Sequence, residues 1–144
     1  MSITISKILC SAHGSDFSDL AAIRNQIPKS STIARLLEEA EVVSAPDIFI
    51  PEVTNVFWKY YKLVDLPITT CEQGLENALE LVDELTPSAS LVTEVFAASC
   101  LASHPAYDLF YIVIARRLNG TLVTLDQKLL HCAAKLGVRT AETR

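Results

Sequence analysis

The sequence predicts an α/β fold in which helices cover both faces of a parallel β-sheet. Short β-branched stretches alternate along the chain with longer segments of helical periodicity. At 144 residues, half of them apolar, the chain has the size and composition of one compact domain. Strands that are joined through helices run parallel, and no repeat or linker interrupts the pattern. We therefore expect a single domain over residues 1–144.

The first half of the chain contains two expected strands and three expected helices. The stretch from Ile3 to Ser11 is apolar and β-branched, and a weaker helical segment follows over residues 17–25. The stretch STIARLLEEA (31–40) begins with capping hydroxyls and continues with helical spacing. EVVSAPDIFI (41–50) predicts a second strand, after which Pro51 opens the helix PEVTNVFWKYYKL.

The second half of the chain alternates in the same way. Helical spacing predicts three helices, over residues 72–85, 91–102 and 104–117. Asn119 and Gly120 are typical of a helix C-terminus and mark the end of the last of them. The strand TLVT (121–124) and the helix DQKLLHCAAKLG (126–137) follow, and residues 138–140 predict a last strand.

Composition excludes several classes of protein. The net charge of −5 argues against a broad cationic surface that grips duplex DNA. The cysteines form no CxxC pair, which favours free thiols in a reducing cytoplasm over a disulfide framework or a zinc site. No segment approaches the roughly 20 apolar residues of a membrane span, and no signal peptide is evident. We expect a cytoplasmic protein with no membrane segment.

Three acidic residues lie where an open parallel sheet holds its ligand, beyond the carboxyl ends of the strands. Asp126 follows the strand TLVT with Thr124 beside it, Glu52 is the second residue of PEVTNVFWKYYKL, and Asp108 is in the first turn of its helix. Each has a structural explanation, because the helix dipole stabilises such an acid by about 0.3–1 kcal/mol and Asp126 can be an N-cap. Their convergence nevertheless indicates a site.

Asp108 carries the strongest signal. The segment LFYIVIA that follows it is apolar on every face, which predicts a helix surrounded by protein. A carboxylate there needs a cation, yet no Lys or Arg is at helical spacing, since Arg116 and Arg117 are two turns away. Converging carboxylates without basic partners suit Mg²⁺ or Mn²⁺, and such a metal commonly supports phosphodiester hydrolysis.

The segments APDIFIPEVTNVFWK, HPAYDLFYIVIARRLNGTLVTLDQKLL and AAKLGV resemble those of PIN-domain proteins, particularly the VapC-type toxins of bacterial toxin–antitoxin pairs. The resemblance covers about two thirds of the chain, over residues 45–138. It implies a parallel sheet flanked by helices and metal-dependent cleavage of RNA. By this resemblance Glu52, Asp108 and Asp126 match the acids around one or two divalent ions, and Thr124 matches a polar neighbour. It also implies homodimers and a cognate antitoxin.

One position departs from the family pattern. Family members carry an Asp at the end of the first strand, where this chain has Cys10 within ILCSA. A thiolate is a poor ligand for Mg²⁺, so the substitution is expected to weaken the metal site. Asp16 and Asp19 lie just downstream, and Asp16 is a further candidate metal ligand if the intervening loop folds back. The alternative is that both acids are simple helix-start residues.

The aromatic segment FWKYY (57–61), followed by Lys62, has two interpretations. Its rings and lysines suit unpaired RNA bases and phosphates. Aromatic residues at this spacing more commonly form core or dimer contacts.

The remaining basic and histidine side chains give weaker signals. His104, which precedes Pro105, is most simply a capping residue, and His131 has no evident ligand partner. Arg116, Arg117 and Lys128 are near the acid-bearing segments and are candidates for phosphate contacts, although solvated surface charge explains them equally well.

Two function classes remain open. The first is an active endoribonuclease that uses Glu52, Asp108 and Asp126 to hold Mg²⁺ or Mn²⁺. The second is a PIN-like module, disabled at Cys10, that binds an antitoxin or RNA without cutting it. A third class, an α/β phosphatase or receiver-like domain, ranks last because the first strand offers no Asp as nucleophile or phosphate acceptor.

Overall fold

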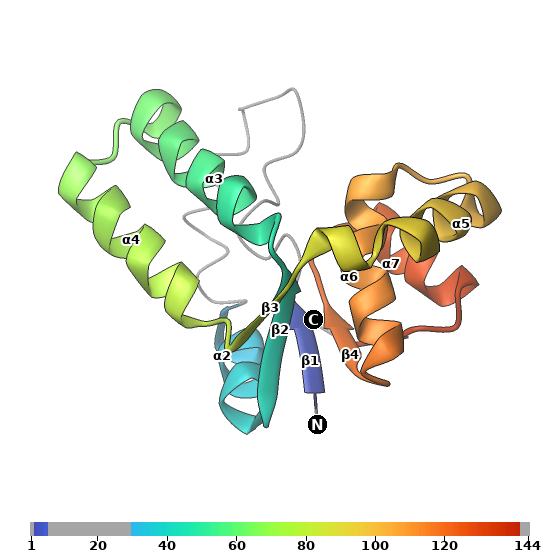
Figure 1. Cartoon of the computed structure of the whole chain (residues 1–144). Helices are drawn as coiled ribbons and strands as arrows, with labels where there is room; N and C mark the ends of the chain where they lie inside the picture. The colour runs from blue at the N-terminus through green and yellow to red at the C-terminus, as the bar shows by residue number, and fades with distance from the viewer. Residues whose placement is uncertain (1, 6–29, 142–144) are drawn as a thin grey trace.

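A computed structural model describes residues 2–5 and 30–141 and contains one five-stranded parallel sheet (Figure 1). The strands are β1 (Ser2–Ile5), β2 (Val42–Pro46), β3 (Glu84–Thr86), β4 (Thr121–Val123) and β5 (Arg139–Thr140), in the spatial order β3-β2-β1-β4-β5. The helices are α2 (Ser30–Glu39), α3 (Phe49–Val64), α4 (Ile68–Glu80), α5 (Val92–Ala102), α6 (Ala106–Arg117) and α7 (Gln127–Lys135), with a 3₁₀ turn η3 (Ser88–Ser90). The predicted α/β fold with a parallel sheet flanked by helices is confirmed.

Strand β1 occupies the centre of the sheet. Thr4 is opposite Ser44 of β2 on one side and Leu122 of β4 on the other, and all three side chains are buried. The first strand was expected to reach Ser11, but residues 6–29 are not among those described. The expected helix over residues 17–25, together with Cys10, Asp16 and Asp19, therefore lies outside the described residues.

Helix α6 is the central helix of the core. It packs against β1, β2 and β4, and every residue from Tyr111 to Ala115 is buried. This confirms the prediction of a helix that is surrounded by protein. In Figure 1, α5, α6 and α7 are grouped on one side of the strands, and α3 and α4 are paired on the other.

The chain reverses sharply between α6 and β4. Asn119 takes a left-handed conformation with φ of 48°, and its N–H bonds the carbonyl of Arg116 at 3.1 Å. The N–H of Gly120 bonds the carbonyl of Ala115 at 2.8 Å, which completes a Schellman C-cap. A Cβ at Gly120 would lie 2.8 Å from the carbonyl oxygen of Ser2, so only glycine fits between the strands there. Because α6 ends where β4 begins, its N-terminal end lies toward the carboxyl ends of the strands.

The helix predicted over residues 72–85 is wrong at both ends. Helix α4 begins at Ile68, directly after Pro67, and stops at Glu80. The residues that follow join the sheet instead, because the N–H of Val43 donates to Oδ2 of Asp83 at 2.8 Å and the N–H of Asp83 donates to the carbonyl of Val43 at 2.8 Å. These two bonds align β3 beside β2. The short, largely exposed β3 has no β-branched run that predicts a strand.

The boundary between β2 and α3 also differs from the prediction. The expected strand over residues 41–50 stops at Pro46, and α3 begins at Phe49, two residues before Pro51. Proline is tolerated there because the first turn of a helix does not need its N–H for an internal bond. Glu52 consequently lies in the first turn of α3.

Helices α3 and α4 pack closely as an antiparallel pair. A Cβ at Gly74 of α4 would overlap the ring of Phe57 on α3, so the absence of a side chain permits this approach. Within the described ranges, none of the helices has the length and apolar character needed to cross a membrane.

Candidate functional site

The three predicted acids come from three different elements and lie at the carboxyl edge of the sheet. Glu52 is on α3, which follows β2, and Asp126 follows β4. Strands β2 and β4 flank β1 and run parallel to it, so both acids emerge at the same edge. Asp108 is in the first turn of α6, whose N-terminal end points to that edge.

Glu52 is joined to the core helix by a hydrogen bond. The hydroxyl of the fully buried Tyr111 on α6 donates to Oε2 of Glu52, which is itself partly buried. A buried tyrosine hydroxyl needs a polar partner, and this bond supplies one while it orients the carboxylate. Sequence reasoning missed Tyr111, because the two residues are 59 positions apart and nothing local pairs them.

Asp108 is paired with a histidine. Oδ2 of Asp108 lies 2.8 Å from Nε2 of His104, and the two side chains are 12% and 15% exposed. The interpretation of His104 as a simple capping residue was therefore wrong, because its side chain is the hydrogen-bond partner of Asp108. The sequence search for partners of Asp108 considered Lys and Arg but not this imidazole. The signal was present in the sequence, since His104 and Asp108 have i, i+4 spacing across Pro105.

Asp126 is the N-cap of α7, as its structural explanation predicted. Its Oδ1 accepts hydrogen bonds from the N–H groups of Lys128 at 2.9 Å and Leu129 at 3.2 Å. Thr124 is fully buried, and its Oγ1 accepts the N–H of Asp126 at 3.2 Å. Thr124 thus holds the backbone from which Asp126 projects.

The charge of Asp108 affects the pKa of Cys132, which lies on α7. Burial raises the pKa of the Cys132 thiol, the negative charge of Asp108 raises it further, and the positive charge of Lys135 opposes both. The thiol therefore stays protonated near neutral pH and is a poor nucleophile.

The donor chemistry of the three acids fits a hard divalent ion. Their carboxylate oxygens are the ligand type that Mg²⁺ and Mn²⁺ prefer. Tyr111 contacts Glu52, His104 contacts Asp108 and backbone N–H groups contact Asp126, in the manner of the outer partners that orient metal ligands. Within residues 2–5 and 30–141, no three His, Cys, Asp or Glu side chains lie close enough together to hold a metal.

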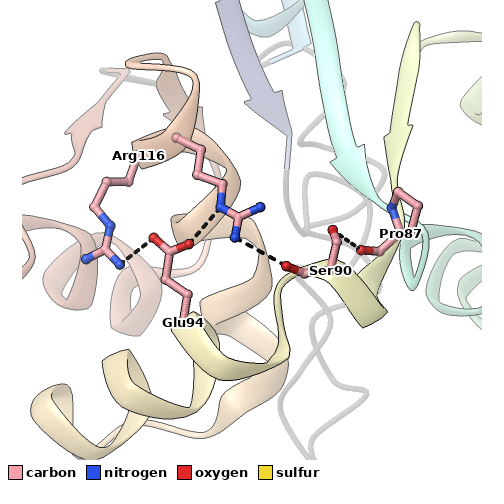
Figure 2. Close-up of polar contacts among 5 residues, drawn as sticks. Pro87, Ser90, Glu94 and Arg116 are labelled. Carbon is pink, nitrogen blue, oxygen red and sulfur yellow. Dashed lines mark hydrogen bonds and ion pairs between the residues drawn. The ribbon is translucent and has the colours of Figure 1, made fainter.

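Arg116 and Arg117 both bind the carboxylate of Glu94. Arg116 donates to Glu94 of α5 at 2.9 Å, as Figure 2 shows, and Arg117 donates to the same carboxylate at 2.7 Å. Arg117 also donates to the carbonyl of Ser90 at 3.2 Å. Burial alone would raise the pKa of Glu94, but the hydrogen bonds and charges of Arg117 and Arg116 outweigh it and hold that pKa below its usual range. These arginines therefore fasten α6 to α5.

The aromatic segment FWKYY divides between core and surface. The rings of Phe57 and Tyr60 meet edge to face with centroids 5.5 Å apart, and both are partly buried. Trp58 and Tyr61 are instead 56% and 49% exposed. The segment thus presents two large aromatic side chains to solvent on α3.

Known proteins that resemble this chain include a sequence relative and a structural neighbour. The chain is 27% identical over 116 residues to a protein named Ribonuclease VapC3 from Pyrobaculum aerophilum, which covers 79% of this chain and 88% of that protein. No family model matches the chain.

The fold is also found in a solved structure. The crystal structure of PAE2754 from Pyrobaculum aerophilum superposes with a TM-score of 0.64 and 21% sequence identity, covering 99% of this chain and 85% of that one. This neighbour fits the PIN-like fold that the sequence motifs predicted. The shared fold and the sequence similarity together support the predicted resemblance of the chain to PIN-domain proteins of the VapC type.

Proposed function

We propose that the chain is a metal-dependent endoribonuclease and the toxin of a type II toxin–antitoxin pair. The observation that carries this proposal is the similarity to Ribonuclease VapC3 over 79% of the chain. The acids at the carboxyl edge of the sheet support it, because a hydrolase of RNA needs charged groups where the phosphodiester binds.

In this proposal Glu52, Asp108 and Asp126 are ligands of Mg²⁺ or Mn²⁺. Because the described residues do not bring three such side chains within metal-binding reach, the proposal requires these carboxylates to move toward the ion. Asp16, outside the described residues, is a further candidate ligand. A bound ion of this kind supplies an activated water and neutralises charge that develops on the phosphoryl group. Tyr111 and His104 orient two of the carboxylates, and Thr124 fixes the backbone at the third.

The proposed partners are single-stranded RNA, a cognate antitoxin and a second copy of the chain. Trp58 and Tyr61, exposed on α3, are the side chains that we expect a protein partner to cover, because large aromatic groups with polar tips are enriched at interfaces. Cys71, Cys100 and Cys132 are free thiols, which supports the reducing cytoplasm that we propose as the location.

The alternative is a PIN-like module that binds RNA or an antitoxin without cutting, disabled by Cys10. Cys10 lies outside the described residues. The similarity to a protein named as a ribonuclease does not favour this alternative.

RNA cleavage tests the proposal. Single-stranded RNA of mixed sequence is incubated with the purified chain in Mn²⁺, in Mg²⁺ or in EDTA. We expect cleavage with either metal, none in EDTA, and a loss of at least about 100-fold in Glu52→Gln and Asp108→Asn. Glu76→Gln, which removes one exposed carboxylate from α4, is the matched control and should cut normally. Equal cleavage by all four proteins, or cleavage in EDTA, would refute the proposed site.

Two variants separate the accounts of the first strand. If Cys10 leaves the metal one ligand short, Cys10→Asp should raise activity and Mn²⁺ should serve better than Mg²⁺, since Mg²⁺ demands stricter octahedral geometry. If Asp16 already supplies the missing carboxylate, Asp16→Asn should abolish cleavage and Cys10→Asp should give no gain. Cys10→Ser is the control for a change of size and polarity without charge.

A further inference from the structure

A pocket opens between the connection from α5 to α6 and one face of α7. Its volume is about 380 Å³, within the roughly 300–1,000 Å³ range of small-ligand sites, so it has room for a nucleotide. It is lined by His104 from the connection and by Lys128, His131, Cys132 and Lys135 from α7. Because Lys128, His131 and Lys135 are spaced i, i+3 and i+7, they share one face of the helix.

The pocket is cationic in a chain whose net charge is −5. Lys128 and Lys135 are exposed, and in the part of the chain that the structure describes neither ammonium has a carboxylate within ion-pair distance. Arg35, Arg116 and Arg117 differ in this respect, since each is paired with a glutamate. The pocket therefore offers an anion two lysine ammonium groups that are not held in ion pairs with the described carboxylates.

The pocket adjoins the candidate site through two of its own residues. His104 lines the pocket while its Nε2 lies 2.8 Å from Oδ2 of Asp108. Lys128 also lines the pocket, and its backbone N–H donates to Oδ1 of Asp126 at 2.9 Å. An anion held here would thus be a neighbour of the carboxylates of Asp108 and Asp126.

We propose that this pocket is an anion subsite that binds a backbone phosphate of the RNA strand, next to the bond at which Glu52, Asp108 and Asp126 act. This inference rests on the proposed function. A nucleic acid strand carries a phosphate at every nucleotide, so a strand engaged at the acids brings further phosphates to the adjoining surface. Lysine ammonium groups bind phosphate as mobile point charges, and their position at the rim suits a strand that enters from solvent.

RNA binding in the absence of divalent metal tests the subsite. A fluorescein-labelled, mixed-sequence single-stranded RNA is titrated in EDTA, over a series of salt concentrations, against the full chain and its Lys128→Gln, Lys135→Gln and double variants. Arg35→Gln is the matched control, because it removes one charge from a 72% exposed side chain on α2. Each lysine variant should weaken binding several-fold, and the slope of log K against log salt should flatten by about 0.7 for each phosphate that a lysine no longer neutralises. The control should match the unmodified chain.

Steady-state cleavage in Mn²⁺ provides a second measurement. A subsite that binds substrate and transition state equally raises KM when it is removed and leaves kcat unchanged. We therefore expect the double lysine variant to show a higher KM with a normal kcat, whereas a variant that merely misfolds would lose kcat as well.

The outcomes distinguish the subsite from the function on which it rests. If the unmodified chain binds and cuts RNA and the lysine variants behave like Arg35→Gln, the subsite is refuted while the ribonuclease stands. If the unmodified chain neither binds nor cuts RNA, both proposals fail. If the lysine variants weaken the binding of poly-glutamate but leave the binding of RNA unchanged, the pocket is a surface for an acidic protein and the RNA subsite is refuted.

Discussion

The hydroxyl of Tyr111 donates a hydrogen bond to the carboxylate of Glu52 and so joins the middle of α6 to the first turn of α3. Tyr111 is completely buried, whereas Glu52 is only partly buried, so the bond runs from the core outward to the candidate site. Asp108 lies one turn earlier on the same helix. Helix α6 thus positions two of the three acids. It carries Asp108 itself, and it holds Glu52 through the hydroxyl of Tyr111.

Replacing Tyr111 by Phe should lower both stability and activity. The change removes only the hydroxyl, so the fold is retained, but Glu52 loses its buried donor at a cost of about 1–3 kcal/mol in the free energy of unfolding. Loss of a partner that orients a ligand should also reduce cleavage by about 10–100-fold. Urea unfolding and RNA cleavage measure the two effects. Tyr107→Phe is the control, because that side chain is on the same helix but 71% exposed. Equal effects from the two changes would contradict this role of Tyr111.

The carboxylate of Glu94 should stabilise the chain in a pH-dependent way. Its pKa is lowered in the folded protein despite burial, through hydrogen bonds and charges from Arg117 and Arg116. A depressed carboxyl pKa contributes stability above the unfolded-state pKa, and this contribution is lost as the pH falls through the folded-state pKa. Glu94→Gln should therefore cost up to about 1 kcal/mol at neutral pH and less in high salt.

At acid pH, below the folded-state pKa of Glu94, the unmodified chain and Glu94→Gln should be equally stable. Urea unfolding of both proteins across the acid range measures the difference. Glu76→Gln should show no such convergence, because Glu76 is exposed on α4 away from the two arginines. A difference between Glu94→Gln and the unmodified chain that stays constant with pH would rule out the ion pairs as its cause.

The exposed aromatic pair on α3 should contribute to association. Trp58 and Tyr61 are one helical turn apart and largely exposed, so Trp58→Ala with Tyr61→Ala should leave the melting temperature nearly unchanged while weakening self-association or antitoxin capture. Light scattering and co-purification with a co-expressed antitoxin measure this. Leu101→Ala removes a 79% exposed apolar side chain from α5 as the control. If the unmodified chain is a monomer that captures no antitoxin, this role of the pair is refuted.

Much of the fold was predictable because local signals agree with the tertiary structure. The apolar segment after Asp108 became the buried helix α6, and Asp126 became the cap that its position before QKLL predicts. Strand β3 could not be predicted, since its three residues are mostly exposed and it is aligned by Asp83 and β2 rather than by its own composition.

The contacts around the acids were less predictable than the acids themselves. The bond between Tyr111 and Glu52 depends on how α3 and α6 pack, which no local pattern encodes. The pair of His104 and Asp108 could have been predicted from its i, i+4 spacing. Pro105 between them indicated a helix boundary, however, and this led to the interpretation of His104 as a capping residue. The cationic pocket lies between the connection from α5 to α6 and helix α7, which are far apart in the sequence, so only the structure reveals it.

Mn²⁺ binding measured through stability tests most directly whether Glu52, Asp108 and Asp126 form one metal site. We expect Mn²⁺ at a hundredfold excess over its dissociation constant to raise the free energy of unfolding by about 2.7 kcal/mol. Asp126→Asn should remove most of that increase while the helix stays capped, because Asn caps as well as Asp. Asp83→Asn, which changes a carboxylate at the junction of β2 and β3, should retain the Mn²⁺ response. A free energy of unfolding that is indifferent to Mn²⁺ in the unmodified chain, or that responds equally in Asp126→Asn, would contradict the metal site.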